Sequence, residues 1–320
     1  MKNQEWSFER AIKQAAKALR GNRSLGNQRR FYQELTADPT ITLQELLPNF
    51  QLSLAVTYWC QALVAAQGEP AVAWAKVHLV WRAYAPDWIV YLERSAQLAR
   101  EFPEKLRRDR LGIARVDYDA LGQILMTMAF SASLGEDEAA RRLGDRCVQM
   151  AVHREPIAEA DMLSVGSTEP FLFRLYCAWR GLDVDYERLG VRGYGPFSPV
   201  FEQWHAASAM EQATMGLCRL HAFKAVNFDL PDDDFVFGLQ QGPFSEFPVE
   251  ILFLQRVRRD LGLPVPNPEH PLLRSPLMRI PFPCPRSGYD PDLDWIYSKC
   301  KEQIPHLYVP WEEEIGKTRG

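Results

Sequence analysis

Residues 50–66, FQLSLAVTYWCQALVAA, form the stretch that decides the fold class of this chain. None of these side chains is charged, and the polar ones are only Gln51, Ser53, Thr57 and Gln61. A helix that is apolar nearly all round must be enclosed by other helices. The stretch is also shorter than the roughly 20 apolar residues that a membrane-spanning helix needs. It therefore predicts a buried central helix and no membrane association.

A second helix is predicted to pair with the first after a break at residues 68–70. Pro70 suits the first position of a helix, where its missing N–H has no partner to lose. The apolar positions of this second helix are Trp74, Val77, Trp81 and Tyr84. Pro86 is expected to open a further helix over residues 87–102 in the same way. A capping box at residues 42–45 predicts a separate short helix that ends near Pro48.

The rest of the chain repeats this helical pattern. Apolar residues recur at helical spacing, and glycine or proline stands at the expected ends. The further predicted helices are residues 6–19, 118–134, 136–152, 171–180, 198–226, 248–262 and one opened by Asp290. No segment is typical of a strand. We expect an all-α fold, either a multi-helix bundle or stacked antiparallel helical hairpins.

The chain is expected to form a single helical domain over residues 1–320. Residues 190–199, GVRGYGPFSP, are the one place where a subdivision is conceivable, because glycine and proline are dense there. The same segment can equally be an ordered loop that holds Tyr194 and Phe197 against the body. Residues 263–289 are rich in proline and cannot form regular helix. Since they also carry apolar side chains, we expect them to wrap the body in an extended conformation.

Charge and composition exclude several classes of function. The formal net charge of −4 argues against a general nucleic-acid-binding protein. Residues 1–14 carry charges but no apolar segment, so no secretory signal is expected and a cytoplasmic location is predicted. The six cysteines are far apart and mostly within apolar helical patterns, which favours reduced, buried thiols over disulfides.

Motifs for catalysis, for cofactor binding and for metal binding are absent from the sequence. There is no phosphate-binding loop, no dinucleotide fingerprint and no nucleophile elbow, and no two histidines have the spacing of a helical metal site. We therefore expect no enzyme, no cofactor and no metal. The alternative is a dispersed site in a helical bundle around His205, Glu211 and His221. A Cys218–His221 nucleophile pair is a further candidate, although packing accounts for this spacing equally well.

One C-terminal stretch is similar to a known protein family. Residues 246–277 read EFPVEILFLQRVRRDLGLPVPNPEHPLLRSPL: a proline-opened amphipathic helix, a proline linker, then HPLL and a second PL. This pattern resembles the C-terminal part of the immunity protein 49 family, all-helical immunity proteins of bacterial polymorphic-toxin systems. The resemblance implies a cytoplasmic protein without catalysis that binds a cognate toxin and occludes its active site. It implies no direct contact with nucleic acid or membrane.

Acidic and aromatic residues are the predicted contacts with such a toxin. Toxins that act on nucleic acid carry basic surfaces, so acidic segments would steer the association, and aromatic residues are frequent interface anchors. The predicted contacts are Asp232, Asp233, Asp234, Phe235, Phe237, Phe244, Glu246, Glu250, Trp311, Glu312, Glu313 and Glu314. Core packing is the alternative for each aromatic residue. The other functional alternatives are the dispersed enzyme above and a helical scaffold that binds a peptide.

Overall fold

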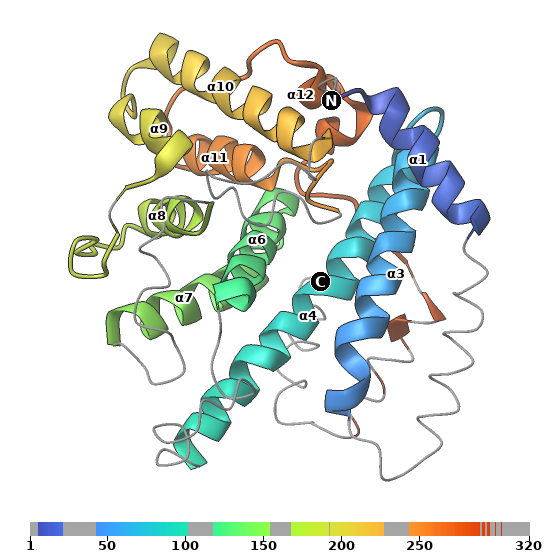
Figure 1. Cartoon of the computed structure of the whole chain (residues 1–320), viewed down its shortest axis with the longest axis horizontal. Coiled ribbons are helices and arrows are strands. Elements are labelled where there is room, and N and C mark those ends of the chain that lie inside the picture. Colours follow the sequence, from blue (N-terminus) through green and yellow to red (C-terminus); the bar gives the residue numbers. More distant parts are fainter. Residues whose placement is uncertain are drawn as a thin grey trace.

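The protein is all-helical in the computed structural model (Figure 1). The structure describes residues 6–21, 43–101, 118–153, 168–191, 193–226 and 243–288, with single positions from 290 to 302. No strand occurs in these ranges. The elements are α1 (Phe8–Gly21), α3 (Leu43–Ala65), α4 (Pro70–Glu101), α6 (Tyr118–Leu134), α7 (Asp137–His153), α8 (Thr168–Arg180), η1 (Gly195–Phe197), α9 (Ser198–Glu202), α10 (Ala207–Val226), α11 (Val249–Asp260), α12 (Pro271–Arg274) and η2 (Pro276–Arg279).

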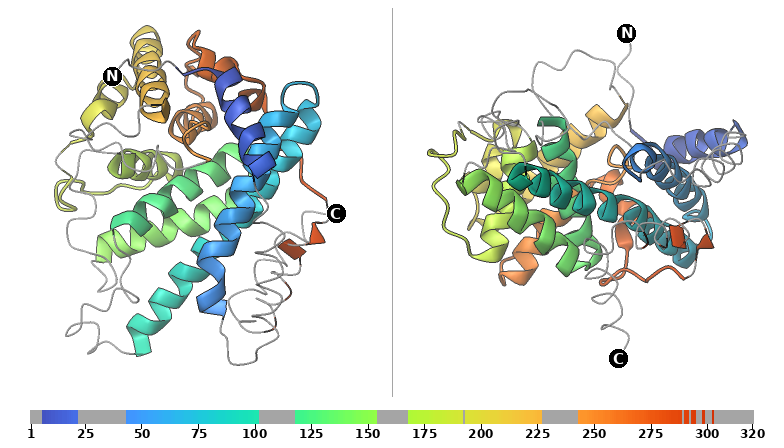
Figure 2. Two further views of the ribbon diagram at one scale, coloured as in Figure 1. Left: turned by 45° about the vertical axis from the view of Figure 1, so that its right-hand side comes forward. Right: turned by 90° about the horizontal axis from the view of Figure 1, so that it is seen from below.

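The predicted central hairpin is formed by α3 and α4. These long helices lie side by side in Figure 1 and in both views of Figure 2, and α1 packs against α3. From Leu54 onward α3 is buried as predicted, including Tyr58 and Trp59, while Val56 remains exposed. On α4 the side chains of Val77 and Trp81 are almost completely buried. From Leu54 onward most of the uncharged stretch is thus enclosed, because both partner helices cover it.

Two proline-based predictions of helix boundaries were wrong. Helix α3 already begins at Leu43 and runs through Pro48, so there is no separate short helix before residue 50. Helix α4 likewise continues through Pro86 to Glu101. A proline inside a helix removes one backbone hydrogen bond and costs about 3 kcal/mol. The apolar surface buried along one continuous helix, such as Leu92 beyond Pro86, offsets that loss.

A second group of helices, α6, α7, α8 and α11, packs beside α4. Gly135 separates α6 from α7, as the sequence predicts, and its φ of 86° is the left-handed conformation that glycine adopts without strain.

Gly144 on α7 leaves room for the Tyr176 ring of α8, because an added Cβ would lie 2.2 Å from that ring. The Tyr176 hydroxyl donates to the Asp145 carboxylate at 2.6 Å.

In its described residues, 190–191 and 193–199, the glycine-rich loop packs against α8. Phe197 is buried and stacks on Phe171 with ring centroids 4.4 Å apart. The Arg174 guanidinium lies 4.8 Å from the Tyr194 ring centroid and 4.1 Å from that of Phe201. Of the two interpretations of this loop, an ordered segment that holds its aromatic side chains against the body describes what the structure shows.

The single helix predicted over residues 198–226 is broken into α9 and α10 by a turn at residues 203–206. The carbonyl of Trp204 does not continue the helical ladder, because it accepts a 2.6 Å hydrogen bond from the buried Arg258. Tertiary contact with α11 therefore replaces a local hydrogen bond at this point. No sequence signal marks the break, since Arg258 lies 54 residues away.

The proline-rich C-terminal segment crosses α4 and the end of α6. Apart from the single turns α12 and η2, which the sequence did not predict, its described residues are irregular and bend at residues 282–283. The amide of Cys284 donates to the carbonyl of Leu134, and Arg82 donates to the carbonyl of Gly288. Asp290 accepts the amide hydrogen of Leu293, as expected of a helix cap.

Nearly all of the buried apolar side chains in the described residues belong to one cluster that extends from Ala11 on α1 to Leu293. The loop at residues 190–199 therefore does not separate two cores in the described part of the chain. None of the described helices combines the length and the apolar character required to cross a membrane.

Candidate functional site

The candidate site is a hollow formed by the turns that follow α11. Pro271 and Pro276 open α12 and η2, where a missing N–H is tolerated. His270 caps α12, because its Nδ1 accepts the amide hydrogen of Leu272 at 3.2 Å. Ser275 has extended backbone between the two turns and so redirects the chain. These residues are the NPEHPLLRSPL part of residues 246–277.

Four contacts fix this segment to the body. Leu272 and Leu277 are completely buried. The indole N–H of Trp74 on α4 donates to the carbonyl of Pro276 at 3.4 Å. Glu211 on α10 accepts the amide hydrogen of Asn267 at 2.9 Å. The backbone of the site is thus held from both α4 and α10, which prepares its exposed side chains for binding at a low entropic cost.

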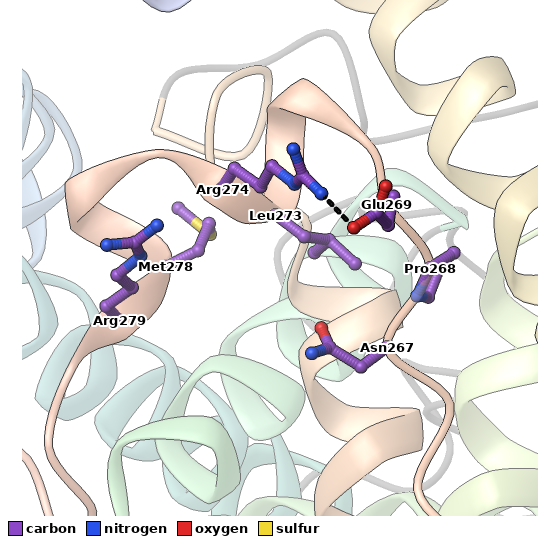
Figure 3. Close-up of a pocket in the computed structure, with 7 residues that line it drawn as sticks. All are labelled: Asn267, Pro268, Glu269, Leu273, Arg274, Met278 and Arg279. Atoms are coloured by element: carbon purple, nitrogen blue, oxygen red, sulfur yellow. Dashed lines mark ion pairs between the residues drawn. The ribbon is translucent and has the colours of Figure 1, made fainter.

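The hollow has a volume of about 380 Å³ (Figure 3). It is lined by Asn267, Pro268, Glu269, Leu273, Arg274, Met278 and Arg279. Figure 3 places Arg279 and Met278 on one side, facing Asn267 and Pro268 on the other. Glu269 forms an ion pair with Arg274. The lining thus combines charged groups with the apolar surface of Leu273 and Met278.

The electrostatics of the hollow favour an anionic group. Two guanidinium groups and one carboxylate line it, so two positive charges and one negative charge leave one positive charge. Burial lowers the pKa of the adjacent His270, and the nearby charges of Arg219 and His221 lower it further. His270 therefore stays neutral at pH 7 and keeps its cap. Arginine forms bidentate hydrogen bonds with carboxylates, which gives both affinity and orientation.

The predicted acidic and aromatic contacts do not gather at this hollow. Phe244 is completely buried, and its ring packs against Tyr84 and Phe130, so core packing is the correct interpretation for this residue. Glu246 is half-buried and accepts hydrogen bonds from Trp59 and Ser245. Nine further predicted contacts lie outside the described residues: Asp232, Asp233, Asp234, Phe235, Phe237, Trp311, Glu312, Glu313 and Glu314.

Glu250, the remaining predicted contact, is buried beside His221. His221 Nδ1 lies 2.8 Å from the Glu250 carboxylate, and Nε2 lies 3.1 Å from the carbonyl of Ser245. Both neighbours are acceptors, so the ring donates from both nitrogens as an imidazolium. Burial alone would lower the pKa of His221, but the Glu250 charge and these hydrogen bonds raise it above its ordinary value. Glu250 therefore serves the interior and presents no surface to a partner.

The structure does not assemble the alternative enzyme site around His205, Glu211 and His221. His205 is exposed in the turn before α10, and Glu211 holds the Asn267 amide. His221 has no ring nitrogen free to take up a proton, since both already donate. Glu211 and His221 therefore serve separate contacts, and His205 is exposed.

A cysteine nucleophile at Cys218 is disfavoured as well. Burial, followed by the Glu250 charge, raises the pKa of the Cys218 thiol to about 12, so the thiol stays protonated. The described cysteines, Cys60, Cys147, Cys177, Cys218 and Cys284, are all free and buried, as predicted. Within the described ranges, no three His, Cys, Asp or Glu side chains are close enough together to hold a metal ion.

One polar constellation was missed by the sequence analysis. Ser287 Oγ lies 2.9 Å from His78 Nδ1, and His78 Nε2 lies 3.3 Å from the Glu136 carboxylate. The backbone N–H of Ser287 also donates to His78 Nδ1 at 3.0 Å, which places the ring proton on Nε2. The residues come from three separate segments, so no local spacing could have indicated the arrangement.

Comparisons of the chain with protein-family models, with curated proteins and with solved structures find no significant match.

Proposed function

We propose that this chain is a non-catalytic, cytoplasmic immunity protein that binds a cognate toxin and occludes its active site. The observation that supports this proposal most is the position of the hollow. The segment that resembles the immunity family is the one that turns back on itself to form it, and the exposed arginines on its wall stand on a fixed backbone. Arginine is enriched at interface hot spots, and a pre-organised wall loses little entropy on binding.

The acidic segments remain part of the proposal as a second contact. Asp232, Asp233 and Asp234 carry three adjacent negative charges, and Glu312 and Glu313 directly follow Trp311 in the sequence. Such charges accelerate association with a basic toxin and select it over other partners. The hollow and the acidic segments would then contact different parts of the same toxin.

Co-expression tests the proposed function directly. The adjacent reading frame of the source genome is expressed alone and together with this chain, growth is scored, and the complex is captured through a tag on this chain. We expect the neighbour to be toxic alone, to be neutralised by co-expression, and to co-purify in a stable complex. A harmless neighbour that does not bind this chain would contradict the proposal.

The acidic segment has its own test. The double variant Asp232→Lys with Asp234→Lys reverses two charges, and we expect weaker, more salt-sensitive capture of the toxin with an unchanged melting temperature. The single variant Asp183→Lys, at an exposed acid in the loop after α8, is the matched control. Unaltered affinity in the double variant would remove this segment from the interface.

A second candidate function, ester hydrolysis, is favoured by the Ser287–His78–Glu136 constellation alone. A serine hydroxyl beside an imidazole that is oriented by a carboxylate is the arrangement of a nucleophile and its base. Ser287 is also half-exposed. However, the Ser287 amide already donates to the basic nitrogen and weakens it as a base. Labelling with a fluorophosphonate that is lost in Ser287→Ala would establish this activity; absence of labelling would leave the constellation as a structural contact.

A further inference from the structure

We infer that the hollow at residues 267–279 binds a carboxylate of the partner protein together with the apolar side chain next to it. The ligand is thus an acidic–apolar element of a polypeptide, such as a Leu-Asp pair on an exposed loop. This inference rests on the proposed function, since it names the part of the toxin that the hollow would recognise.

Arg279 supplies the first argument, because it lines the hollow without a counter-ion. Its side chain is exposed, and in the described part of the chain no carboxylate pairs with it. Most other arginines near the C-terminal segment are engaged: Arg82 pairs with Asp294, and Arg256 pairs with Asp137 and Asp260. An arginine left unpaired beside a hollow is available for a carboxylate from outside.

Arg274 is the second cation, and its present partner is displaceable. Glu269 pairs with Arg274, but the side chain of Glu269 is 85% exposed and that of Arg274 is 57% exposed. An ion pair this exposed contributes little, about 0–1 kcal/mol. An incoming carboxylate can therefore take the place of Glu269, while Glu269 weakens the binding of any anion by competition and repulsion.

The apolar part of the lining supplies the third argument. Met278 is half-buried and lines the hollow, whereas Leu273 is almost completely buried and offers a ligand little surface. Methionine adapts its shape to irregular apolar partners. Pro268 is buried, so Met278 is the main apolar side chain that the hollow presents to a ligand. An isolated inorganic anion would leave Met278 uncovered, whereas an apolar side chain beside a carboxylate would pack on it.

A protein ligand is favoured over a nucleic acid by the sign and extent of the charge. Nucleic-acid sites neutralise several phosphates with an extended series of basic side chains. This hollow carries one net positive charge and includes Glu269, which would repel a neighbouring phosphate. The lining therefore suits a single carboxylate.

Peptide titration tests the inference with the full chain. The probes are two fluorescein-labelled, terminally blocked hexapeptides that differ only in carrying Leu-Asp or Leu-Asn at the centre, measured by fluorescence anisotropy. We expect the Leu-Asp peptide to bind. The Leu-Asn peptide should bind at least about tenfold more weakly, because it lacks one charge-assisted contact. Equal binding of both peptides, or no binding of either, would overturn the carboxylate assignment.

Three variants assign the effect to the hollow. Arg279→Ala is expected to lower the affinity for the Leu-Asp peptide about tenfold, whereas Glu269→Gln, which removes the competitor, is expected to raise it several-fold. Arg259→Ala changes an exposed arginine on α11 outside the hollow and should leave the affinity unaltered. Inorganic phosphate and a single-stranded oligonucleotide are titrated in parallel. Arg279-dependent binding of either one in place of the peptide would contradict a protein ligand.

The toxin experiment separates the two proposals. If the toxin is still neutralised by the double variant Arg274→Ala with Arg279→Ala, the immunity function stands and the inference about the hollow is wrong. If no toxin complex forms but the Leu-Asp peptide binds in an Arg279-dependent manner, the hollow has the proposed chemistry and the immunity function is wrong.

Discussion

At the scale of single residues, the buried pair of His221 and Glu250 shows how the interior uses its charges. Neither side chain is exposed by more than 1%. A buried charge is tolerated only when it is paired and hydrogen-bonded, and His221 meets both conditions through Glu250 and the Ser245 carbonyl. The pair joins α10 to the start of α11, the helix that leads into the segment of the hollow.

Breaking this pair should destabilise the protein strongly. Glu250→Gln leaves the imidazolium buried without its counter-ion, and we expect a loss of about 3–5 kcal/mol in the free energy of unfolding. Chemical denaturation followed by circular dichroism measures the effect. Glu269→Gln, at an exposed carboxylate, is the control and should change the stability little. A loss below 1 kcal/mol for Glu250→Gln would mean that the pair is not charged.

The same pair predicts a pH dependence with a definite sign. The pKa of His221 is higher in the folded protein than in the unfolded chain, where it is about 6.5. Its stabilisation is therefore complete below pH of about 6.5 and is lost as the pH rises through the folded-state value. In the protein with its own sequence, the denaturant concentration at the unfolding midpoint should fall as the pH is raised from 6. If the fall is the same in His221→Gln, another group causes it.

At the scale of helices, two glycines in similar positions should respond oppositely to alanine. Gly216 on α10 has no atom within 4 Å of an added Cβ, so Gly216→Ala should stabilise the protein by about 0.5–1 kcal/mol through helix propensity. Gly144 on α7 faces the Tyr176 ring, and Gly144→Ala should cost about 1–3 kcal/mol by overpacking. Thermal unfolding of both variants checks this pair. A stabilised Gly144→Ala would show that α7 and α8 are less closely packed.

Helices were predictable from the sequence where the signal was local. The glycine stops at Gly135, Gly181 and Gly262 all have positive φ, which few other residues adopt at low cost. Proline was a poor guide to helix starts, because it occurs both at the first position of a helix and inside one. Pro70 begins α4, whereas Pro86 lies inside it. Propensity describes a local cost, and the surface buried by a long helix can exceed it.

The hollow was predictable only in part. The segment that forms it was recognised from its proline and leucine pattern, but acidic residues were chosen as contacts. Arg274 and Arg279 stand in the same stretch, and their placement on the lining of one hollow depends on the change of direction at Ser275. That change is a backbone conformation with no unique sequence signature.

At the scale of the whole molecule, side chains of α4 hold the C-terminal segment in place. His78 and Arg82 bind the backbone of Ser287 and Gly288, across about 200 residues of sequence. The side chain of Arg286 is already exposed, so the double variant His78→Ala with Arg82→Ala should act by loosening the backbone around it. Cleavage by trypsin at Arg286 should become faster while the helical content stays unchanged. Arg82→Ala alone serves as the intermediate case. Unchanged cleavage at Arg286 would show that other contacts, such as that of Cys284 with Leu134, suffice.

The attachment of the C-terminal segment to α4 also has a consequence for biosynthesis. During synthesis the N-terminal part of a chain leaves the ribosome first. Helices α3 and α4 therefore emerge long before their last partners are translated. Trp74, His78 and Arg82 stay without those partners until residues 276–288 have left the exit tunnel. During that interval the hairpin presents its unfinished face to chaperones and to other nascent chains. A stalled or prematurely terminated polypeptide would keep this face exposed and would be a ready substrate for cellular proteases.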